Sequence, residues 1–224
     1  MTGLYIGMTF GGLLMLIFIG ILIYFWFKNR SVKRLTRKLG QSAEVIINKD
    51  IATWAKHTKN KFIKASLYSY GRNMVFEVDG ILVTDKGLIV TEIKSIKGEI
   101  HGDAKNSQWI KQMGQKQHAT GNPIIQNDKH IKHIMDMTGI KVPIVSLIVY
   151  SNRAESIKIT NQPEHVVLTR HSELFNSLDK INSILERKLS EHQVKKLYNE
   201  IKSFKTNSSK DIKLHKEITG QNRR

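Results

Sequence analysis

The N-terminal part of the chain is one long apolar stretch. Residues 1–27 contain no charged side chain, and residues 4–27 are almost entirely apolar. A helix that crosses a bilayer needs about 20 such residues. A cleaved signal peptide would begin with a basic segment and end in small residues, whereas this stretch starts uncharged and ends in four aromatic residues. The pattern therefore predicts a transmembrane anchor over residues 1–27.

Residues 28–38 are strongly basic and contain no acidic side chain. Positive residues collect on the cytoplasmic side of a membrane. We therefore expect a basic juxtamembrane segment, an N-terminus outside the cell, and a single-pass protein of the cell membrane whose main domain is cytoplasmic. Gly3, Gly7 and Gly11 recur every four residues, a spacing that lets two membrane helices approach closely. A homodimer through these glycines is a further prediction, although glycine is also simply common in such helices.

Beyond the basic segment, the hydrophobic period alternates between that of helices and that of strands. Helical spacing covers residues 35–62, 124–139, 174–185 and 190–204, and strand-like runs cover 75–100, 141–150 and 165–169, whereas residues 56–72 have the composition of a basic loop. The pattern predicts an α/β domain over residues 39–170, C-terminal helices over 171–205 and a basic, disordered tail over 206–224.

The two strands predicted within residues 75–100 carry acids inside apolar stripes. If the turn between them has an even number of residues, Asp79 lies opposite Glu92, and Glu77 lies opposite Lys94. Two facing carboxylates repel each other, and an ion such as Mg²⁺ between them would remove the repulsion. Two alternatives remain: an odd-numbered turn with a bulge, which breaks this register, and a half-exposed hairpin whose charges face water.

These residues also resemble a known family. Asp79, followed after a hairpin by Glu92-Ile93-Lys94, resembles the D…ExK signature of PD-(D/E)xK nucleases. The sequence around these residues resembles the nuclease-related domain (NERD) family. The likeness includes the flanking segments EVDGILVT and GLIVTEIKSIKGEI, Trp109 and the later segment GNPIIQ. The likeness extends from about residue 40 to about residue 126 and on through the later strands.

The resemblance implies a restriction-endonuclease-like core, a mixed sheet flanked by helices. In such a core, Asp79, Glu92 and the backbone carbonyl of Ile93 would hold Mg²⁺ or Mn²⁺, which polarises the scissile phosphate and activates water. Lys94 would orient or deprotonate that water and offset the charge that develops on phosphorus.

Two further residues complete the catalytic set that the resemblance implies. Glu44 lies on the first helix of the domain, in a stretch that departs from the family pattern because Ala43 stands where a second glycine is usual. Gln126 lies near the start of a predicted helix, where the dipole favours phosphate. Each side chain could instead simply face solvent, as charged and amide groups commonly do.

The charge of the chain favours an anionic partner. The net charge is +17, and the absence of cysteine excludes disulfides, thiolate metal sites and cysteine nucleophiles. Lysine and arginine can neutralise phosphates, so we expect nucleic acid, with DNA first, as the partner, and anionic lipid as the competing one. Lys97, Lys105, Trp109 and Lys111 are the predicted substrate-binding residues, although Trp109 could instead anchor the core.

Together these features predict a membrane-anchored, metal-dependent nuclease that hydrolyses phosphodiester bonds of nucleic acid at the cytoplasmic face. A membrane-tethered module that binds nucleic acid without cleaving it is one alternative, because a fold does not dictate an activity. A scaffold that binds anionic lipid is the other.

Overall fold

One long helix begins the chain. The computed structural model describes the backbone of residues 2–220 and the side chains of residues 15–28, 30 and 39–220. Contacts divide the chain into two units, Met1–Ser42 and Ala43–Arg224, and helix α1 (Thr2–His57) belongs to both. In the described part of the chain, no helix has an apolar stretch long enough to count as a membrane span. Residues 2–14 of the predicted anchor, with Gly3, Gly7 and Gly11, lie outside the described side chains.

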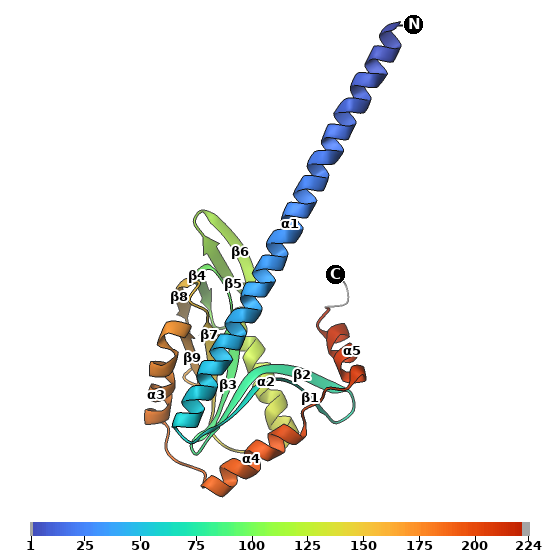
Figure 1. Cartoon of the computed structure of the whole chain (residues 1–224). Helices are drawn as coiled ribbons and strands as arrows, with labels where there is room; N and C mark the ends of the chain where they lie inside the picture. Colours follow the sequence, from blue (N-terminus) through green and yellow to red (C-terminus); the bar gives the residue numbers. More distant parts are fainter. Residues whose placement is uncertain (1, 221–224) are drawn as a thin grey trace. The chain divides into compact units, whose positions relative to one another are not determined.

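The centre of the second unit is a five-stranded mixed sheet (Figure 1). Its strand order is β1-β2-β3-β7-β9, in which β1 to β3 are antiparallel and β3, β7 and β9 are parallel. The strands are β1 (Lys61–Tyr70), β2 (Met74–Thr84), β3 (Gly87–Lys94), β7 (Ile144–Tyr150) and β9 (Val166–Arg170). The mixed sheet confirms the predicted α/β class.

Helices cover both faces of this sheet. Residues of α2 (Pro123–Thr138) and α4 (Glu191–Ser203) share one core cluster with residues of β2 and β3, among them Ile81, Val83, Leu88 and Val90. The end of α1 and α3 (Leu174–Ile184), which follows a short 3₁₀ turn (His171–Glu173), form a second cluster with Leu82 and Ile89. Because successive side chains of a strand point to opposite faces, the two clusters lie on opposite sides of the sheet.

A second sheet has the order β6-β5-β4-β8, where β4 (Gly98–Asp103), β5 (Gln108–Met113), β6 (Lys116–Gly121) and β8 (Ala154–Thr160) are short. The hydrophobic pattern predicts no strand over residues 101–121. The strands form because few but large side chains face inward. Ile100 is fully buried and Trp109 is 1% exposed, and both pack against Ile124 of α2 and the end of β7.

Three predictions about the secondary structure are wrong in detail. The first helix ends at His57 rather than at residue 62. The segment predicted as a loop contains β1, because Ile63 and Tyr68 of this segment face the core while its lysines occupy positions that do not. The predicted disordered tail contains helix α5 (Ser209–Ile218). Its N-terminus is capped by the Ser208 hydroxyl, which accepts a hydrogen bond from the Asp211 N–H at 3.0 Å.

Candidate active site

The β2–β3 hairpin brings the two predicted acids together at the end of its ladder. The strands pair in the register predicted for an even-numbered turn, and in the described part of the chain this pairing ends at Gly80 and Thr91. The next residue, Asp79, accepts a hydrogen bond through Oδ2 from the backbone N–H of Ile93, at 2.7 Å. The strands therefore separate where the acids lie, and the Asp79 carboxylate takes the place of a backbone partner.

Glu77 does not pair with Lys94, although the same register predicts it. The pairs that β2 makes in the described structure join Glu77 to Leu67 of β1 instead. The Glu77 side chain is 53% exposed, and its Oε2 lies 4.0 Å from Nδ1 of His215 on α5. Glu77 is therefore a neighbour of the acids rather than a partner of the lysine.

The pKa values of three carboxylates are raised in this region. Glu92 is 2% exposed, and burial, the charge of Asp79 and, more weakly, the charge of Glu44 raise its pKa to about 7 against the opposing pull of Lys94. Burial also raises the pKa of Asp79, although a backbone N–H and Lys94 counteract it. The pKa of Glu44 on α1 is raised by burial and then by Asp79. The structure thus places Glu44 near the hairpin acids.

Lys94 connects the acids to helix α2. Its Nζ lies 2.6 Å from Oε1 of Glu92 and donates a hydrogen bond to Oε1 of Gln126, at 2.8 Å. The lysine side chain is 24% exposed, so its ammonium reaches solvent from the rim of the site. Four of the five predicted catalytic residues therefore form one connected group with Ile93, and Glu44 approaches it from α1.

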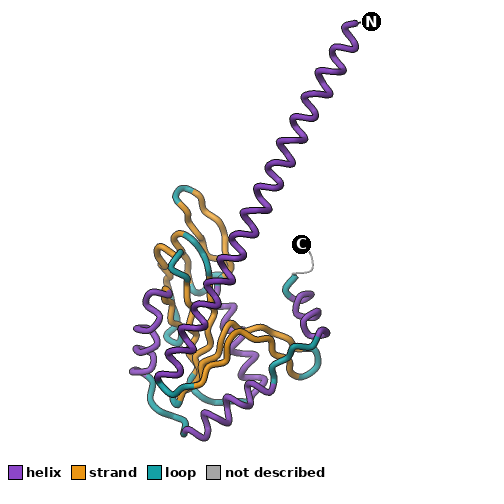
Figure 2. The backbone as a smooth tube through the Cα atoms, in the orientation of Figure 1, coloured by secondary structure: helices purple, strands orange, loops and turns teal. Residues whose placement is uncertain are grey.

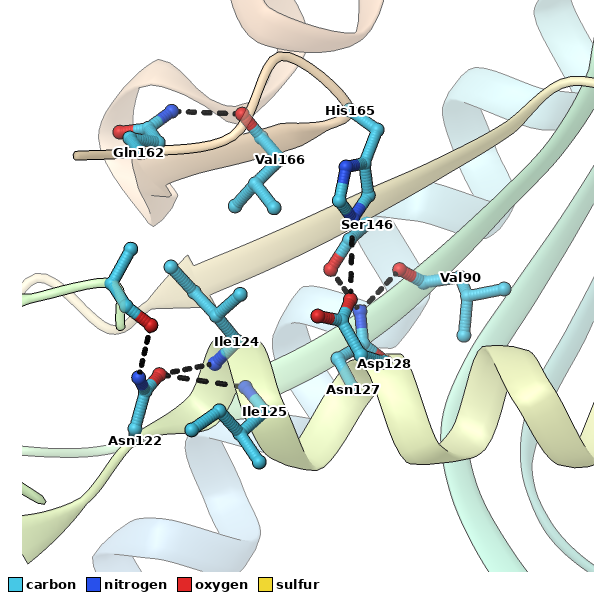
Figure 3. A network of polar contacts seen from close by, with 11 residues as sticks. Val90, Asn122, Ile124, Ile125, Asn127, Asp128, Ser146, Gln162, His165 and Val166 are labelled. Atoms are coloured by element: carbon cyan, nitrogen blue, oxygen red, sulfur yellow. Dashed lines mark hydrogen bonds and ion pairs between the residues drawn. The ribbon is translucent and has the colours of Figure 1, made fainter. Parts of the chain in front are cut away.

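Helix α2 is held against the sheet by two asparagines (Figure 3). Asn122 caps the helix, because its Oδ1 accepts a hydrogen bond from the Ile124 N–H at 2.8 Å. Asn127 is fully buried and donates from Nδ2 to the Val90 carbonyl and to the Ser146 hydroxyl, both at 2.9 Å. Because these bonds tie α2 to β3 and β7, they fix the position of the side chains that α2 presents to the acids.

Two residues near Glu92 were missed by the sequence analysis. His130 Nε2 lies 3.6 Å from Oε2 of Glu92, and burial is the main cause that lowers the pKa of His130 to about 4. Tyr150, at the end of β7, is fully buried, and burial followed by the charge of Glu92 raises its pKa. The spacing between Gln126 and His130 was an available signal, because residues four apart share a helix face.

The residues present fit a divalent cation. Asp79 and Glu92 are largely buried carboxylates whose pKa values are raised by burial first and, for Glu92, next by the charge of Asp79, and a cation between them would favour their charged forms. The N–H and C=O groups of one strand residue point towards the same neighbouring strand. The Ile93 N–H is directed towards β2, so the Ile93 carbonyl is directed towards β2 as well. In the described residues, no group of three or more histidine, aspartate or glutamate side chains could hold a metal. The fit therefore rests on two carboxylates and a carbonyl.

Trp109 is a core residue, and its predicted contact with substrate is wrong. It is 1% exposed, and its indole N–H donates to the Asp103 carbonyl at 2.8 Å. Its ring packs on Gly102, where a Cβ atom would lie 2.4 Å from Cγ of the indole. A ring enclosed in this way cannot stack on a base, so the structure supports the alternative that Trp109 anchors the core.

The three predicted substrate-binding lysines lie on or beside the second sheet. Lys97 is exposed in the connection between β3 and β4, Lys105 is exposed in the turn between β4 and β5, and Lys111 is half-buried on β5. Contact of these lysines with nucleic acid stays a prediction.

Comparison with known proteins assigns the chain to a family. The model of the nuclease-related domain matches residues 39–151, which contain all five predicted catalytic residues. The chain is also 27% identical over 128 residues to an uncharacterized protein of Bacillus anthracis, a match that covers 56% of this chain and 58% of that protein. No solved structure matches the chain. The family model covers half of the sequence, and the chain therefore belongs to the nuclease-related domain (NERD) family, within the PD-(D/E)xK-like nuclease superfamily.

Proposed function

We propose that this protein is a metal-dependent nuclease that hydrolyses phosphodiester bonds, with DNA as its first candidate substrate. One observation carries the proposal: the Asp79 and Glu92 carboxylates lie at the open end of a hairpin, with the Lys94 ammonium 2.6 Å from Glu92. Repelling acids beside a fixed cation are costly to bury, and their arrangement suits the binding of a divalent ion and a phosphate.

Asp79, Glu92 and the Ile93 carbonyl would hold Mg²⁺ or Mn²⁺. When bound, such an ion acts as a Lewis acid on a phosphoryl oxygen and lowers the pKa of a coordinated water. Contacts within the chain hold both carboxylates. Asp79 is fixed by the Ile93 N–H, and Glu92 is held by the Lys94 ammonium.

Lys94 would place positive charge where negative charge develops in the reaction. Its ammonium is held from two sides, by Glu92 and by Gln126, so little reorganisation is needed when a phosphate arrives. His130 is neutral near pH 7 because its pKa is about 4. A neutral imidazole whose Nε2 lies 3.6 Å from the Glu92 carboxylate would restrict the position of that carboxylate without adding a competing positive charge.

The proposal can be tested with the full-length chain in detergent micelles. We expect cleavage of linear DNA that requires Mg²⁺ and stops in EDTA. The variants Asp79→Asn and Lys94→Met should lose roughly a hundredfold or more of this activity, which is the size of effect found when one preorganised electrostatic group is removed. Glu155→Gln, an exposed position on β8, is the matched control and should retain full activity.

Three outcomes would contradict this proposal. Binding of DNA without cleavage would favour the non-catalytic binding module. Cleavage that survives Asp79→Asn would place the chemistry elsewhere. Binding to anionic vesicles with no affinity for nucleic acid at moderate salt would favour the lipid scaffold.

We also propose that residues 1–27 anchor the protein in the cell membrane, with the catalytic domain on the cytoplasmic side. Support comes from the uncharged apolar run and from the basic residues that follow it. Close to this junction, the Arg30 guanidinium lies over the Trp26 ring, 5.1 Å from its centroid, an arrangement suited to the interfacial region. The same proposal includes the homodimer contact through Gly3, Gly7 and Gly11.

Membrane fractionation tests the anchor. The full chain should stay in the membrane pellet after an alkaline carbonate wash, whereas a variant with Ile19→Lys and Leu22→Lys should be released, because lysine is costly at the centre of a span. External protease should leave the catalytic domain intact in closed cells. Release of the unsubstituted chain by carbonate would refute the anchor.

A further inference from the structure

A hollow lies at the end of the sheet opposite the candidate active site. It has a volume of about 690 Å³ and is lined by the turn between β2 and β3, the end of α1, the end of α3 and the start of α4. The turn precedes β3, whereas Glu92 and Lys94 lie at the far end of that strand, roughly 20 Å away at 3.3 Å per residue. The hollow is therefore separate from the catalytic residues.

The walls of this hollow are tied together by the protein itself. The Asp85 carbonyl accepts hydrogen bonds from the backbone N–H groups of Lys188 and Leu189, at 2.9 and 2.8 Å, so the linker between α3 and α4 is fixed to the hairpin turn (Figure 2). The Lys86 ammonium donates to the Asn182 carbonyl at the end of α3. The hollow is thus a formed site rather than a gap between mobile loops.

The hollow carries more positive charge than its own acids balance. Five cationic side chains line it, at positions 59, 61, 86, 187 and 195, against the two acids Asp85 and Glu191. Asp85 is already paired with Arg187, at 3.4 Å. Among the described residues, no ion pair is made by Lys59, Lys61 or Lys195, whose ammonium groups remain to bind an anion.

Lys59 occupies a position where glycine is normally favoured. Helix α1 ends in a Schellman motif, in which the Asn60 N–H donates to the Ala55 carbonyl and the Lys59 N–H donates to the Lys56 carbonyl. Lys59 has φ of 59°, in the left-handed region that costs side chains with a Cβ free energy. The chain accepts this strain and so has a cationic residue in the wall of the hollow, where glycine would provide no charge.

We propose that this hollow is a binding site for a small ligand with phosphate groups, of about the size of a nucleotide. The volume lies within the range typical of small-molecule sites, and a duplex is too wide to enter it. Several unpaired ammonium groups around one hollow suit a ligand with two or more phosphates better than a single anion. The site goes beyond the proposed nuclease and does not depend on it.

Calorimetric titration of the full-length chain in micelles tests this site, with tripolyphosphate and ATP as probes. EDTA in the buffer removes metal from the catalytic acids, so the probes cannot bind there through a metal ion. We expect binding at one site per chain, and a loss of affinity of roughly tenfold or more in the double variant Lys59→Gly, Lys195→Ala. Because Lys59→Gly relieves the left-handed strain, this variant should fold at least as well as the parent. Lys94→Met should bind normally.

Lys116→Ala, an exposed lysine of β6, is the matched charge control and should not change the affinity. The proposal is overturned if neither probe binds, if the double variant binds as the parent does, or if Lys116→Ala weakens binding equally. It is also overturned if Lys59 is needed for the binding of a duplex oligonucleotide while neither tripolyphosphate nor ATP binds. That last result would assign the hollow to nucleic acid.

Discussion

Replacing Glu92 with glutamine should stabilise the metal-free protein while it abolishes cleavage. Glu92 is almost fully buried, and its pKa of about 7 reflects burial first and the charge of Asp79 second. A carboxyl group whose pKa is higher in the folded than in the unfolded state favours folding at pH values below its unfolded pKa of 4.5. That contribution is lost as the pH rises through about 7, because the folded protein must then hold the charged form.

The expected magnitude follows from the two pKa values. The difference between 4.5 and about 7 corresponds to roughly 3 kcal/mol of folding free energy, at about 1.4 kcal/mol for each pKa unit. This figure already contains the favourable effect of Lys94, which lowers the pKa that burial and Asp79 raise. The variant Glu92→Gln should therefore exceed the parent in stability by up to about 3 kcal/mol at pH 8, and by little at pH 4.5.

Urea unfolding measures this difference. The full-length chain in micelles is unfolded in EDTA at several pH values between 4.5 and 8, and tryptophan fluorescence reports the transition. Glu155→Gln is the control, because the exposed Glu155 should give the same small effect at every pH. The reasoning is refuted if Glu92→Gln is less stable than the parent at pH 8, or if its advantage does not grow with pH. Addition of Mg²⁺ should stabilise the parent and leave the variant nearly unchanged.

Three further predictions concern the scaffold. Lys59→Gly should stabilise the protein by roughly 1 kcal/mol, because glycine adopts the left-handed conformation without strain, and a lower melting temperature in calorimetry would contradict this. Gly102→Ala should destabilise by about 1–3 kcal/mol in urea unfolding, because its Cβ would lie 2.4 Å from the enclosed ring of Trp109. Gly121→Ala, with open space around the new Cβ, is the control, and equal effects of the two changes would refute the packing argument. Asn122→Ala should cost roughly 1–2 kcal/mol in the same assay, because it removes the cap of α2 and two hydrogen bonds to backbone carbonyls, and no loss would show that the cap does not stabilise α2.

Local signals explain what the sequence predicted well. The β2–β3 register depends on a two-residue turn and on alternation within one hairpin, both of which can be read from neighbouring residues. The start of α2 at Asn122-Pro123 and its end at Gly139, with φ of 64°, depend on capping chemistry that is equally local. The helix predicted from residue 190 begins at a capping box of Ser190 and Gln193, which is also a local signal.

The missed strands depend on contacts that are distant in the sequence. In β5 only Trp109 is buried, and in β6 no residue is, so neither strand shows a clear alternating pattern. Their pairing partners and the burial of Trp109 come from β4, α2 and β7. A short polar strand of this kind is recognised only when its neighbours are known.

The residues of the candidate site also form two groups: those that a local sequence pattern reveals and those that depend on distant contacts. Asp79, Glu92 and Lys94 belong to one hairpin and were found from its pattern and its resemblance to the family. His130 and Tyr150 reach Glu92 only because α2 crosses β3 and because β7 runs parallel to it. The exposure of a tryptophan or a histidine cannot be derived from its neighbours in the sequence, so the role of each such residue could not be assigned before the fold was known.

The order of the strands also sets the order in which the site is completed during folding. The β2–β3 hairpin closes through a two-residue turn, whereas β3 meets β7 only after the whole of β4–β6 and α2 has been arranged between them. Contacts between distant segments form more slowly than local ones, because a longer loop must be closed first. We therefore expect the two acids to be neighbours while water still surrounds them, and to lose that water when the crossover docks.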